Sequence, residues 1–301
     1  MKVLLPPPLR TGDRIGVAAP AGPVRRPALE HGIAALERGG YAVTRGEHLT
    51  DRTGYLAGSD RHRAADLNRM LADPDLHAIW FARGGYGSHR IVAELDFAAL
   101  RRAPKALVGY SDITVLHAAA WKAAGLVGFH GPLVAELGDR EAYDAPALWR
   151  ALGGRTLRFT LTRGSTLRPG RGEGPIVGGC LSVLVALLGT PFELDTRGTI
   201  LFWEEVNEEP FRIDRMLAQL RLAGSLKGLR GMVVGRLLNC RASRAANDLP
   251  LAEILQAHLA GTDYPVVVDF PAGHCDGKVT LPLGRTARLD ATARRLSIRS
   301  A

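Results

Sequence analysis

The chain has 301 residues and a formal net charge of +9, with 46% hydrophobic and 23% charged residues. This balance is typical of a globular protein and excludes a disordered one, and the length is sufficient for two domains. No apolar run approaches the roughly 20 residues that span a bilayer, and three prolines at 6–8 interrupt any signal-peptide core. We therefore expect a cytoplasmic protein with no membrane association.

Cysteine and arginine usage exclude two further classes. The three cysteines, Cys180, Cys240 and Cys275, are an odd number without metal-ligand spacing, which argues against a disulfide framework and a zinc site. The arginines are dispersed and only 6% of residues are aromatic, which argues against a nucleic-acid partner. The positive charge is compatible with small anionic substrates.

The first half of the chain alternates strand-like and helix-like patterns, which predicts a mostly parallel sheet with helices on its faces. The predicted elements are a strand at 14–19, a helix at 27–38, a strand at 41–44, a helix at 59–72 capped by Ser59, and a strand at 77–82.

The segment 105–114 is an apolar strand-like run that reaches Ser111 and then becomes helix-like, ending near Gly125. A serine on a tight strand-to-helix turn is held with its hydroxyl exposed and is a candidate nucleophile. The alternative is that Ser111 or Asp112 only caps the helix, since both residue types are preferred caps. This segment alone favours the cap.

The glycine-rich stretch 83–87 follows the predicted strand at 77–82. Ligands of open parallel sheets bind at the carboxyl ends of the strands, where both this turn and Ser111 are expected. A phosphate-binding loop is one interpretation, but the fingerprint G-x-G-x-x-G is incomplete. The other is a close backbone approach to substrate, with an N–H that binds an oxyanion.

The pattern weakens beyond residue 138, and turn residues and charge concentrate at 162–172. We therefore expect an N-terminal domain at 1–140, a linker at 141–173 and a C-terminal domain at 174–301. The elements predicted in the last domain are helices at 181–188 and 213–220 and strands at 199–203, 231–237, 266–270, 279–281, 287–289 and 296–298.

A serine nucleophile needs a base, and histidine is the usual one. Among nine histidines, His274 follows a predicted strand in a glycine-flanked loop and is the best candidate, while His130 is a plausible pocket residue. His117 lies on the apolar face of the helix after Ser111, which indicates a core or supporting role. Cys275, an alternative nucleophile, lacks a strand-to-helix turn.

A carboxylate would complete the site by fixing the histidine tautomer. The apolar strand at 199–203 ends in Glu204 and Glu205. An acid next to a buried strand is either paired or functional, unless both acids are solvated at the strand end.

These pieces, in this order, resemble the LD-carboxypeptidase family of serine peptidases, which includes the muramoyltetrapeptide carboxypeptidases and the microcin C immunity peptidases. The resemblance covers nearly the whole chain, and no single motif carries it alone. The matching segments are Thr11–Pro20, Arg83–Gly87, Gly109–Asp112, His130–Pro132, Gly178–Gly179, Leu201–Leu217 with Pro210–Arg215, Gly273–His274 and Pro282–Gly284.

The resemblance implies a Rossmann-like, flavodoxin-like N-terminal α/β domain and a mixed C-terminal domain with a strand-rich, barrel-like part. Carried over by position, it implies Ser111 as nucleophile, Glu204 as the orienting acid and His274 as the base. The oxyanion donors are then the N–H groups of Gly85 and Asp112.

Substrate-binding positions are predicted at Arg83, which suits a substrate with several carboxylates, and at Gly84, Tyr110 and His130. The chain departs from the family where a serine often follows the first-strand proline, here Ala21. It departs again where an asparagine follows the second Gly-Gly, here Cys180. Both departures bear on the pocket and not on the three catalytic positions.

The activity that the resemblance implies is release of the terminal D-alanine from murein tetrapeptides, without a metal or organic cofactor, by a homodimer. One alternative keeps the chemistry and changes the substrate to a peptidyl-nucleotide of the microcin C type. The other is a non-catalytic α/β ligand-binding module in which Ser111 is only a cap.

Overall fold

The computed structural model describes residues 2–162, 164–241, 249–259 and 261–300. Its contacts divide the chain into two compact units. The first comprises Met1–Arg155, Asp276–Gly284 and Ser300–Ala301, and the second comprises Thr156–Cys275 and Arg285–Arg299. Each unit is described by itself below.

The first unit is built on a six-stranded sheet with the strand order β12-β5-β4-β3-β1-β2. Strands β1 to β5 are parallel, and their order 2-1-3-4-5 is that of the flavodoxin-like fold, which confirms the prediction. β12 pairs antiparallel with β5 at one edge. The strands are β1 (Arg14–Ala18), β2 (Ala42–Arg45), β3 (Ala78–Phe81), β4 (Ala106–Gly109), β5 (Gly128–His130) and β12 (Leu281–Leu283).

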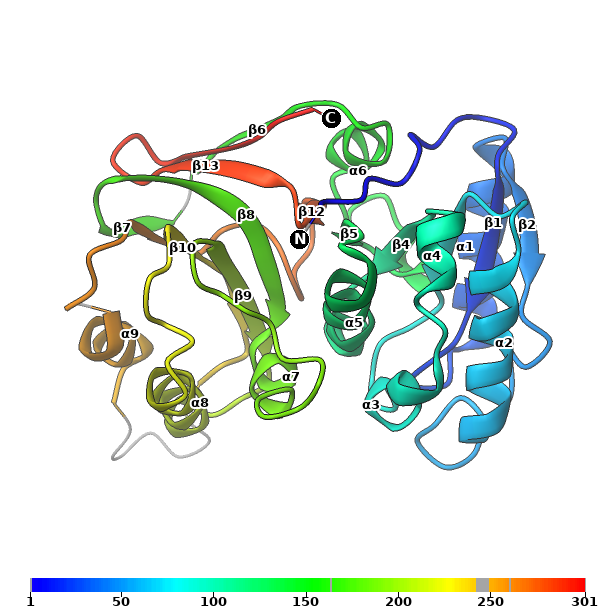
Figure 1. Ribbon diagram of the computed structural model, residues 1–301, viewed down its shortest axis with the longest axis horizontal. Helices are drawn as coiled ribbons and strands as arrows, with labels where there is room; N and C mark the ends of the chain where they lie inside the picture. The colour runs from blue at the N-terminus through cyan, green and yellow to red at the C-terminus, as the bar shows by residue number, and fades with distance from the viewer. Residues whose placement is uncertain (1, 163, 242–248, 260, 301) are drawn as a thin grey trace. The chain divides into compact units, whose positions relative to one another are not determined.

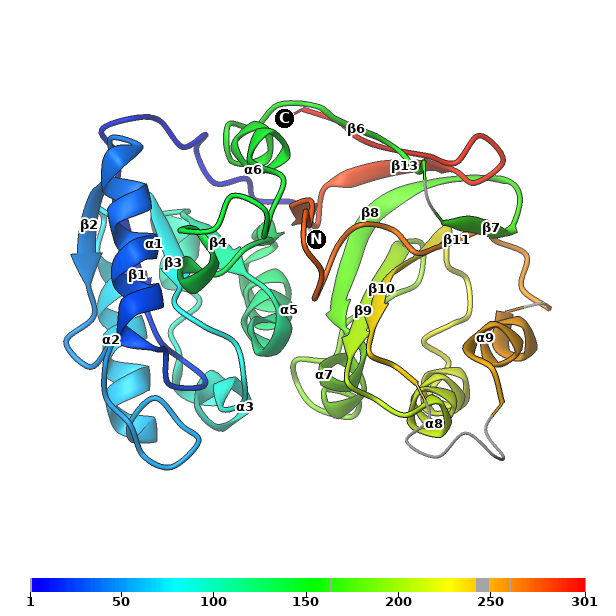
Figure 2. The same ribbon diagram turned by 180° about the vertical axis from the view of Figure 1, so that it is seen from behind.

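Helices cover both faces of this sheet, with α1 nearer the viewer in Figure 2 and α2 nearer in Figure 1. α2 begins where predicted, because the Ser59 hydroxyl accepts a hydrogen bond from His62 N, and α5 ends at Gly125 in the left-handed conformation. The helices are α1 (Arg26–Arg38), α2 (Asp60–Ala72), α3 (Ser88–Ile91), α4 (Ala99–Arg102), α5 (Thr114–Ala124) and α6 (Ala145–Leu152), with short 3₁₀ segments η1 (Val92–Glu94), η2 (Ser111–Ile113) and η3 (Val134–Glu136).

The second unit is a curled eight-stranded mixed sheet with the order β6-β14-β13-β8-β9-β10-β11-β7, which confirms the predicted strand-rich part (Figure 1). The four strands β8 to β11 are parallel, and the outer strands are antiparallel. The strands are β6 (Leu157–Thr160), β7 (Ser165–Arg168), β8 (Arg171–Cys180), β9 (Ile200–Val206), β10 (Gly231–Leu238), β11 (Val266–Val268), β13 (Thr286–Asp290) and β14 (Arg295–Ile298).

Three helices, α7 (Leu181–Ala186), α8 (Pro210–Leu222) and α9 (Leu251–Leu259), pack with β9 and β10 in one apolar cluster. The helical spacing of Ile213, Leu217 and Leu220 gives α8 its buried stripe. Alternate residues of β9, Leu201 and Trp203, face the same cluster. The intervening residues of β9 therefore point to the opposite face of the sheet, which carries the site described below.

The segment 141–173, expected as a linker, contains α6, β6 and β7. β6 and β7 pair as the two edge strands of the eight-stranded sheet, although turn residues dominate the local composition. Arg163 lies outside the described residues. The domain boundaries at 140 and 174 stay a prediction. No described helix has the length and apolarity needed to cross a bilayer.

Candidate active site

Ser111 lies on the turn between β4 and α5, and its backbone is strained. It has φ 65°, in the left-handed region, and η2 begins at this residue. A non-glycine residue pays roughly 1–2 kcal/mol for this conformation. Such strain at a strand-to-helix turn is characteristic of a nucleophile elbow, in which the serine hydroxyl stands clear of the sheet.

The capping alternative does not fit the hydrogen bonds at this turn. Neither η2 nor α5 has a side-chain cap. The buried Asp112 carboxylate accepts instead from Ser88 N, 2.8 Å away, at the start of α3. Burial raises the pKa of Asp112, while its hydrogen bond with Ser88 opposes the rise. Asp112 therefore ties the segment after the glycine loop to the turn that carries Ser111.

The glycine loop lies directly against Ser111. A Cβ built on Gly84 would come within 2.8 Å of Ser111 Cβ and 3.0 Å of Ser111 Oγ, so only glycine fits there. Gly84 O accepts a hydrogen bond from Gly22 N at 2.9 Å, which fixes the loop from its other side. Among the described residues, neither Gly85 N nor Asp112 N donates a hydrogen bond. Both N–H groups are available to an oxyanion.

The predicted substrate-binding residues lie around the same turn. Arg83 is exposed, and one of its nitrogens donates to Pro23 O at 2.8 Å. His130, at the end of β5, is buried and lies in register with Gly109 of β4. Its ring centroid is 5.7 Å from that of Tyr110. The first unit thus gathers all the N-terminal positions that the sequence singled out.

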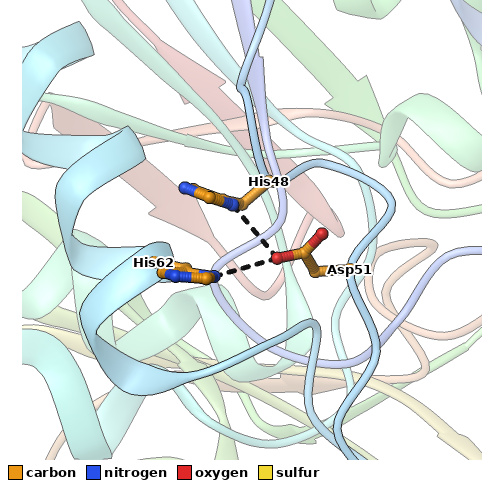
Figure 3. Close-up of side chains that lie close together, drawn as sticks. All are labelled: His48, Asp51 and His62. Atoms are coloured by element: carbon orange, nitrogen blue, oxygen red, sulfur yellow. Dashed lines mark hydrogen bonds and ion pairs between the residues drawn. The ribbon is translucent and has the colours of Figure 1, made fainter.

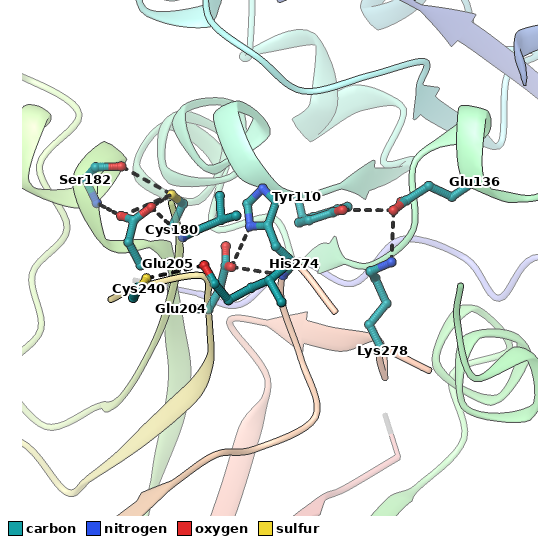
Figure 4. A network of polar contacts seen from close by, with 11 residues as sticks. Tyr110, Glu136, Cys180, Ser182, Glu204, Glu205, Cys240, His274 and Lys278 are labelled. Carbon is teal, nitrogen blue, oxygen red and sulfur yellow. Dashed lines mark hydrogen bonds and ion pairs between the residues drawn. The ribbon is translucent and has the colours of Figure 1, made fainter. Parts of the chain in front are cut away.

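A buried ionic network next to Ser111 was not predicted. Tyr110 Oη donates to Glu136 Oε1 at 2.8 Å, and Lys278 Nζ donates to the same oxygen at 2.9 Å and to Ala142 O at 2.8 Å (Figure 4). Lys278 Nζ also lies 5.4 Å from the centre of the Tyr110 ring. No sequence signal joins Glu136 to Lys278, because 142 positions separate them. The network holds Tyr110, the residue before Ser111.

The buried His117 supports the turn between β4 and α5, as its apolar setting predicted. Its Nε2 lies 2.9 Å from Gly109 O, the last residue of β4. Burial lowers the pKa of His117 to about 4, so the ring is neutral at pH 7. A neutral ring that donates to a backbone carbonyl holds the turn and is not the base for Ser111.

In the second unit, the buried Glu204 pairs with the partly exposed His274. Glu204 Oε2 lies 2.7 Å from His274 Nδ1 and accepts from His274 N at 3.1 Å, and the Glu204 side chain has 0% exposure (Figure 4). The carboxylate accepts the Nδ1 proton, which leaves Nε2 as the basic nitrogen of the ring. The pair therefore has the orientation needed for general-base catalysis.

Gly273 makes this pair possible. It has φ 104°, and a Cβ at this position would come within 2.5 Å of Glu204 Cγ. The loop after β11 can approach the carboxylate closely only because this residue has no side chain.

Two domains of one family match this chain, one in each half. The LD-carboxypeptidase N-terminal domain matches residues 15–131, and the LD-carboxypeptidase C-terminal domain matches residues 173–289. The chain belongs to the LD-carboxypeptidase family. This confirms the resemblance and the prediction that the chain is an LD-carboxypeptidase enzyme.

Individual relatives of this LD-carboxypeptidase cover nearly its whole length. A probable murein peptide carboxypeptidase of Bacillus subtilis (strain 168) is 40% identical over 95% of this chain and 91% of its own. The crystal structure of muramoyltetrapeptide carboxypeptidase from Oxalobacter formigenes has 31% identity and a TM-score of 0.85, covering 95% of this chain and 99% of its own. The microcin C7 self-immunity protein MccF in complex with aspartyl sulfamoyl adenosine has 25% identity and a TM-score of 0.90, covering 99% of both chains.

The acid next to Glu204 has a different task in this LD-carboxypeptidase. Glu205 is also buried, so the alternative that both acids are solvated is wrong. Because successive residues of a strand face opposite ways, Glu205 lies on the helix side, where it accepts from Ser182 N at 2.7 Å. Cys180, one of the two departures, lies beside it with Sγ 3.5 Å from Glu205 Oε1 (Figure 4).

Both residues that depart from the family pattern, Ala21 and Cys180, are buried. Ala21 has 0% exposure, and its carbonyl accepts from Ala57 N at 2.8 Å. Burial is the main cause that raises the pKa of the Cys180 thiol well above its ordinary value, and a thiol held in its neutral form is a poor nucleophile.

Proposed function

We propose that the chain removes the terminal D-alanine of murein tetrapeptides, cutting the bond between the diamino acid at position three and D-alanine. The observation that carries this proposal is the strained backbone of Ser111 at the turn after β4, in a chain of the LD-carboxypeptidase family. Strain of this kind persists where the surrounding structure holds a reactive side chain in place. The murein peptide and tetrapeptide carboxypeptidases among its relatives support the substrate class.

In the proposed reaction Ser111 Oγ attacks the scissile carbonyl carbon while His274 Nε2 takes the hydroxyl proton. The carbonyl oxygen becomes an oxyanion that accepts hydrogen bonds from Gly85 N and Asp112 N. Collapse of the tetrahedral intermediate breaks the C–N bond, and His274 returns the proton to the amine of the departing D-alanine.

The resulting acyl-enzyme is an ester of Ser111. Water attacks it with His274 as the base, and the second collapse releases the tripeptide acid and restores the Ser111 hydroxyl. Throughout both steps Glu204 accepts a hydrogen bond from His274 Nδ1 and stabilises the imidazolium. The proposal requires His274 Nε2 to reach Ser111 Oγ during both steps.

The substrate carries several carboxylates, and Arg83 is the proposed group that binds one of them. Its guanidinium is exposed apart from the hydrogen bond to Pro23 O, so further N–H groups can donate. Gly84, Tyr110 and His130 are proposed to line the position of the scissile bond.

The direct test is incubation of the purified chain with murein tetrapeptide and measurement of free D-alanine. The matched control is the same peptide ending in L-alanine, which we expect to stay intact. Cleavage of both peptides, or of neither by a folded enzyme, contradicts the proposal. Cleavage of an aspartyl sulfamoyl adenosine alone would keep the serine chemistry and overturn the murein assignment.

We further propose that the enzyme works in the cytoplasm, in cell-wall recycling, as a homodimer. Two of its relatives are named as carboxypeptidases of murein peptides, and an enzyme that recycles such peptides encounters them inside the cell. Light scattering of the purified chain should give twice the 32.3 kDa of one chain, and fractionation should place it with the cytoplasmic proteins. A monomer mass or a membrane-bound fraction would contradict these points.

A further inference from the structure

Two histidines and an aspartate cluster in the first unit, apart from the residues assigned to catalysis. His48 and Asp51 lie in the segment between β2 and α2, and His62 lies in the first turn of α2 (Figure 3). One ligand atom from each residue lies within 4.8 Å of the others. Imidazole nitrogens and a carboxylate oxygen are ligands that Zn²⁺ and similar divalent transition-metal ions prefer.

The Nδ1 atoms of both histidines lie next to the same carboxylate oxygen of Asp51. Asp51 Oδ2 lies 3.0 Å from His48 Nδ1 and 3.0 Å from His62 Nδ1, and both Nδ1 atoms face the carboxylate (Figure 3). The two rings stack with centroids 3.8 Å apart. In a tetrahedral zinc site, bond lengths near 2.1 Å place the ligand atoms about 3.4 Å apart. Small rotations of the partly exposed imidazoles about their Cβ–Cγ bonds supply this difference.

The backbone already holds the three residues in place. His48 N donates to Asp66 Oδ2 at 2.9 Å, and Asp51 N donates to His48 O at 3.1 Å. His62 N donates to the hydroxyl of the cap residue Ser59. A cation therefore meets donors whose main chain is already ordered, so little conformational entropy is lost on binding.

Two arginines near the cluster are already paired with carboxylates, so their charges oppose a bound cation less than free guanidinium groups would. Arg69 pairs with Asp66 and Glu47, and Arg63 pairs with Asp60. Asp51 supplies the negative charge of the cluster itself.

We propose that His48, Asp51 and His62 form a binding site for one divalent transition-metal ion of the zinc class. Each imidazole presents its Nδ1 lone pair and keeps its proton on Nε2, Asp51 supplies one oxygen, and water completes the tetrahedron. The three side chains are 26%, 37% and 34% exposed, so water reaches the fourth position.

The ion has a structural task and is separate from the reacting atoms. It clamps the segment after β2 to the start of α2. That segment continues to Ala57, whose N–H donates to Ala21 O. Gly22 follows Ala21 in the chain, and its N–H donates to Gly84 O beside Ser111. The clamp therefore stabilises the surroundings of the glycine loop without touching the substrate.

The test is titration of the metal-free full-length chain with Zn²⁺ against a chromophoric indicator, together with thermal unfolding with and without Zn²⁺. We expect one ion per chain and a rise in Tm with Zn²⁺, since an ion that binds the folded state stabilises it. His62→Gln and Asp51→Asn each remove one ligand and should weaken binding by more than roughly 100-fold, beyond the usual loss from an outer-shell change.

His77→Gln is the matched control. His77 Nε2 lies 3.4 Å from Asp13 Oδ1, a single imidazole–carboxylate pair without a second histidine, so this variant should bind Zn²⁺ like the wild type. Absence of binding by the wild type overturns the proposal. Undiminished binding by the His62→Gln and Asp51→Asn variants also overturns it, because the ion would then lie elsewhere.

Discussion

Replacing Ser111 by alanine is expected to lower kcat for D-alanine release by roughly 10⁴- to 10⁶-fold while the chain stays folded. The variant removes the only atom that forms the acyl-enzyme, and it keeps the backbone and the Asp112–Ser88 hydrogen bond. Release of D-alanine from murein tetrapeptide measures the loss, and circular dichroism and Tm measure the fold.

Two further variants separate a nucleophile from a cap. Ser59→Ala removes a real helix cap, so it should cost about 1 kcal/mol of stability and keep kcat. Ser111→Gly should be inactive yet more stable by about 1 kcal/mol, because glycine adopts φ 65° without the side-chain penalty. If Ser111→Ala instead behaves like Ser59→Ala, the hydroxyl is no nucleophile and the proposed reaction fails.

The sequence predicted the parts of this enzyme that depend on local pattern. The alternation of strand and helix patterns led to the mostly parallel sheet with helices on its faces, and the apolar run before Ser111 led to the strand-to-helix turn. The flavodoxin-like character of that sheet came from the family resemblance. The two adjacent acids at the end of β9 could also have been separated in advance. Since Leu201 and Trp203 face the helices, strand parity places Glu205 with them and Glu204 on the other face.

The parts that escaped prediction depend on contacts between distant residues. The segment that contains β12 was assigned to the C-terminal half, but it pairs with β5 of the first unit. A three-residue strand carries too little pattern to specify which sheet it joins. Lys278 reaches Glu136 and Tyr110 for the same reason, since that segment returns to the first unit.

Glutamine in place of Glu204 is expected to lower kcat by up to about 10⁴-fold with little change in KM. The amide has the shape of the carboxylate, and its oxygen in the place of Oε2 can accept from both His274 N and His274 Nδ1, so the fold is kept. However, the amide carries no negative charge, so it cannot stabilise the imidazolium that forms when His274 takes the proton of Ser111. Steady-state kinetics with murein tetrapeptide, together with Tm, measure both effects.

Glu205→Gln is the matched control, because it alters the adjacent buried acid on the opposite face of the same strand. Its carboxylate accepts from Ser182 N and Val206 N, which are structural contacts at the start of α7 and within β9. Loss of a charged acceptor there should lower Tm and leave kcat near the wild-type value. Equal losses of kcat in both variants, or a tenth or more of the activity remaining in Glu204→Gln, would show that Glu204 contributes packing and not the orientation of His274. We expect kcat to fall only in Glu204→Gln and Tm to fall mainly in Glu205→Gln. This result follows only if one face of β9 serves catalysis and the other serves stability.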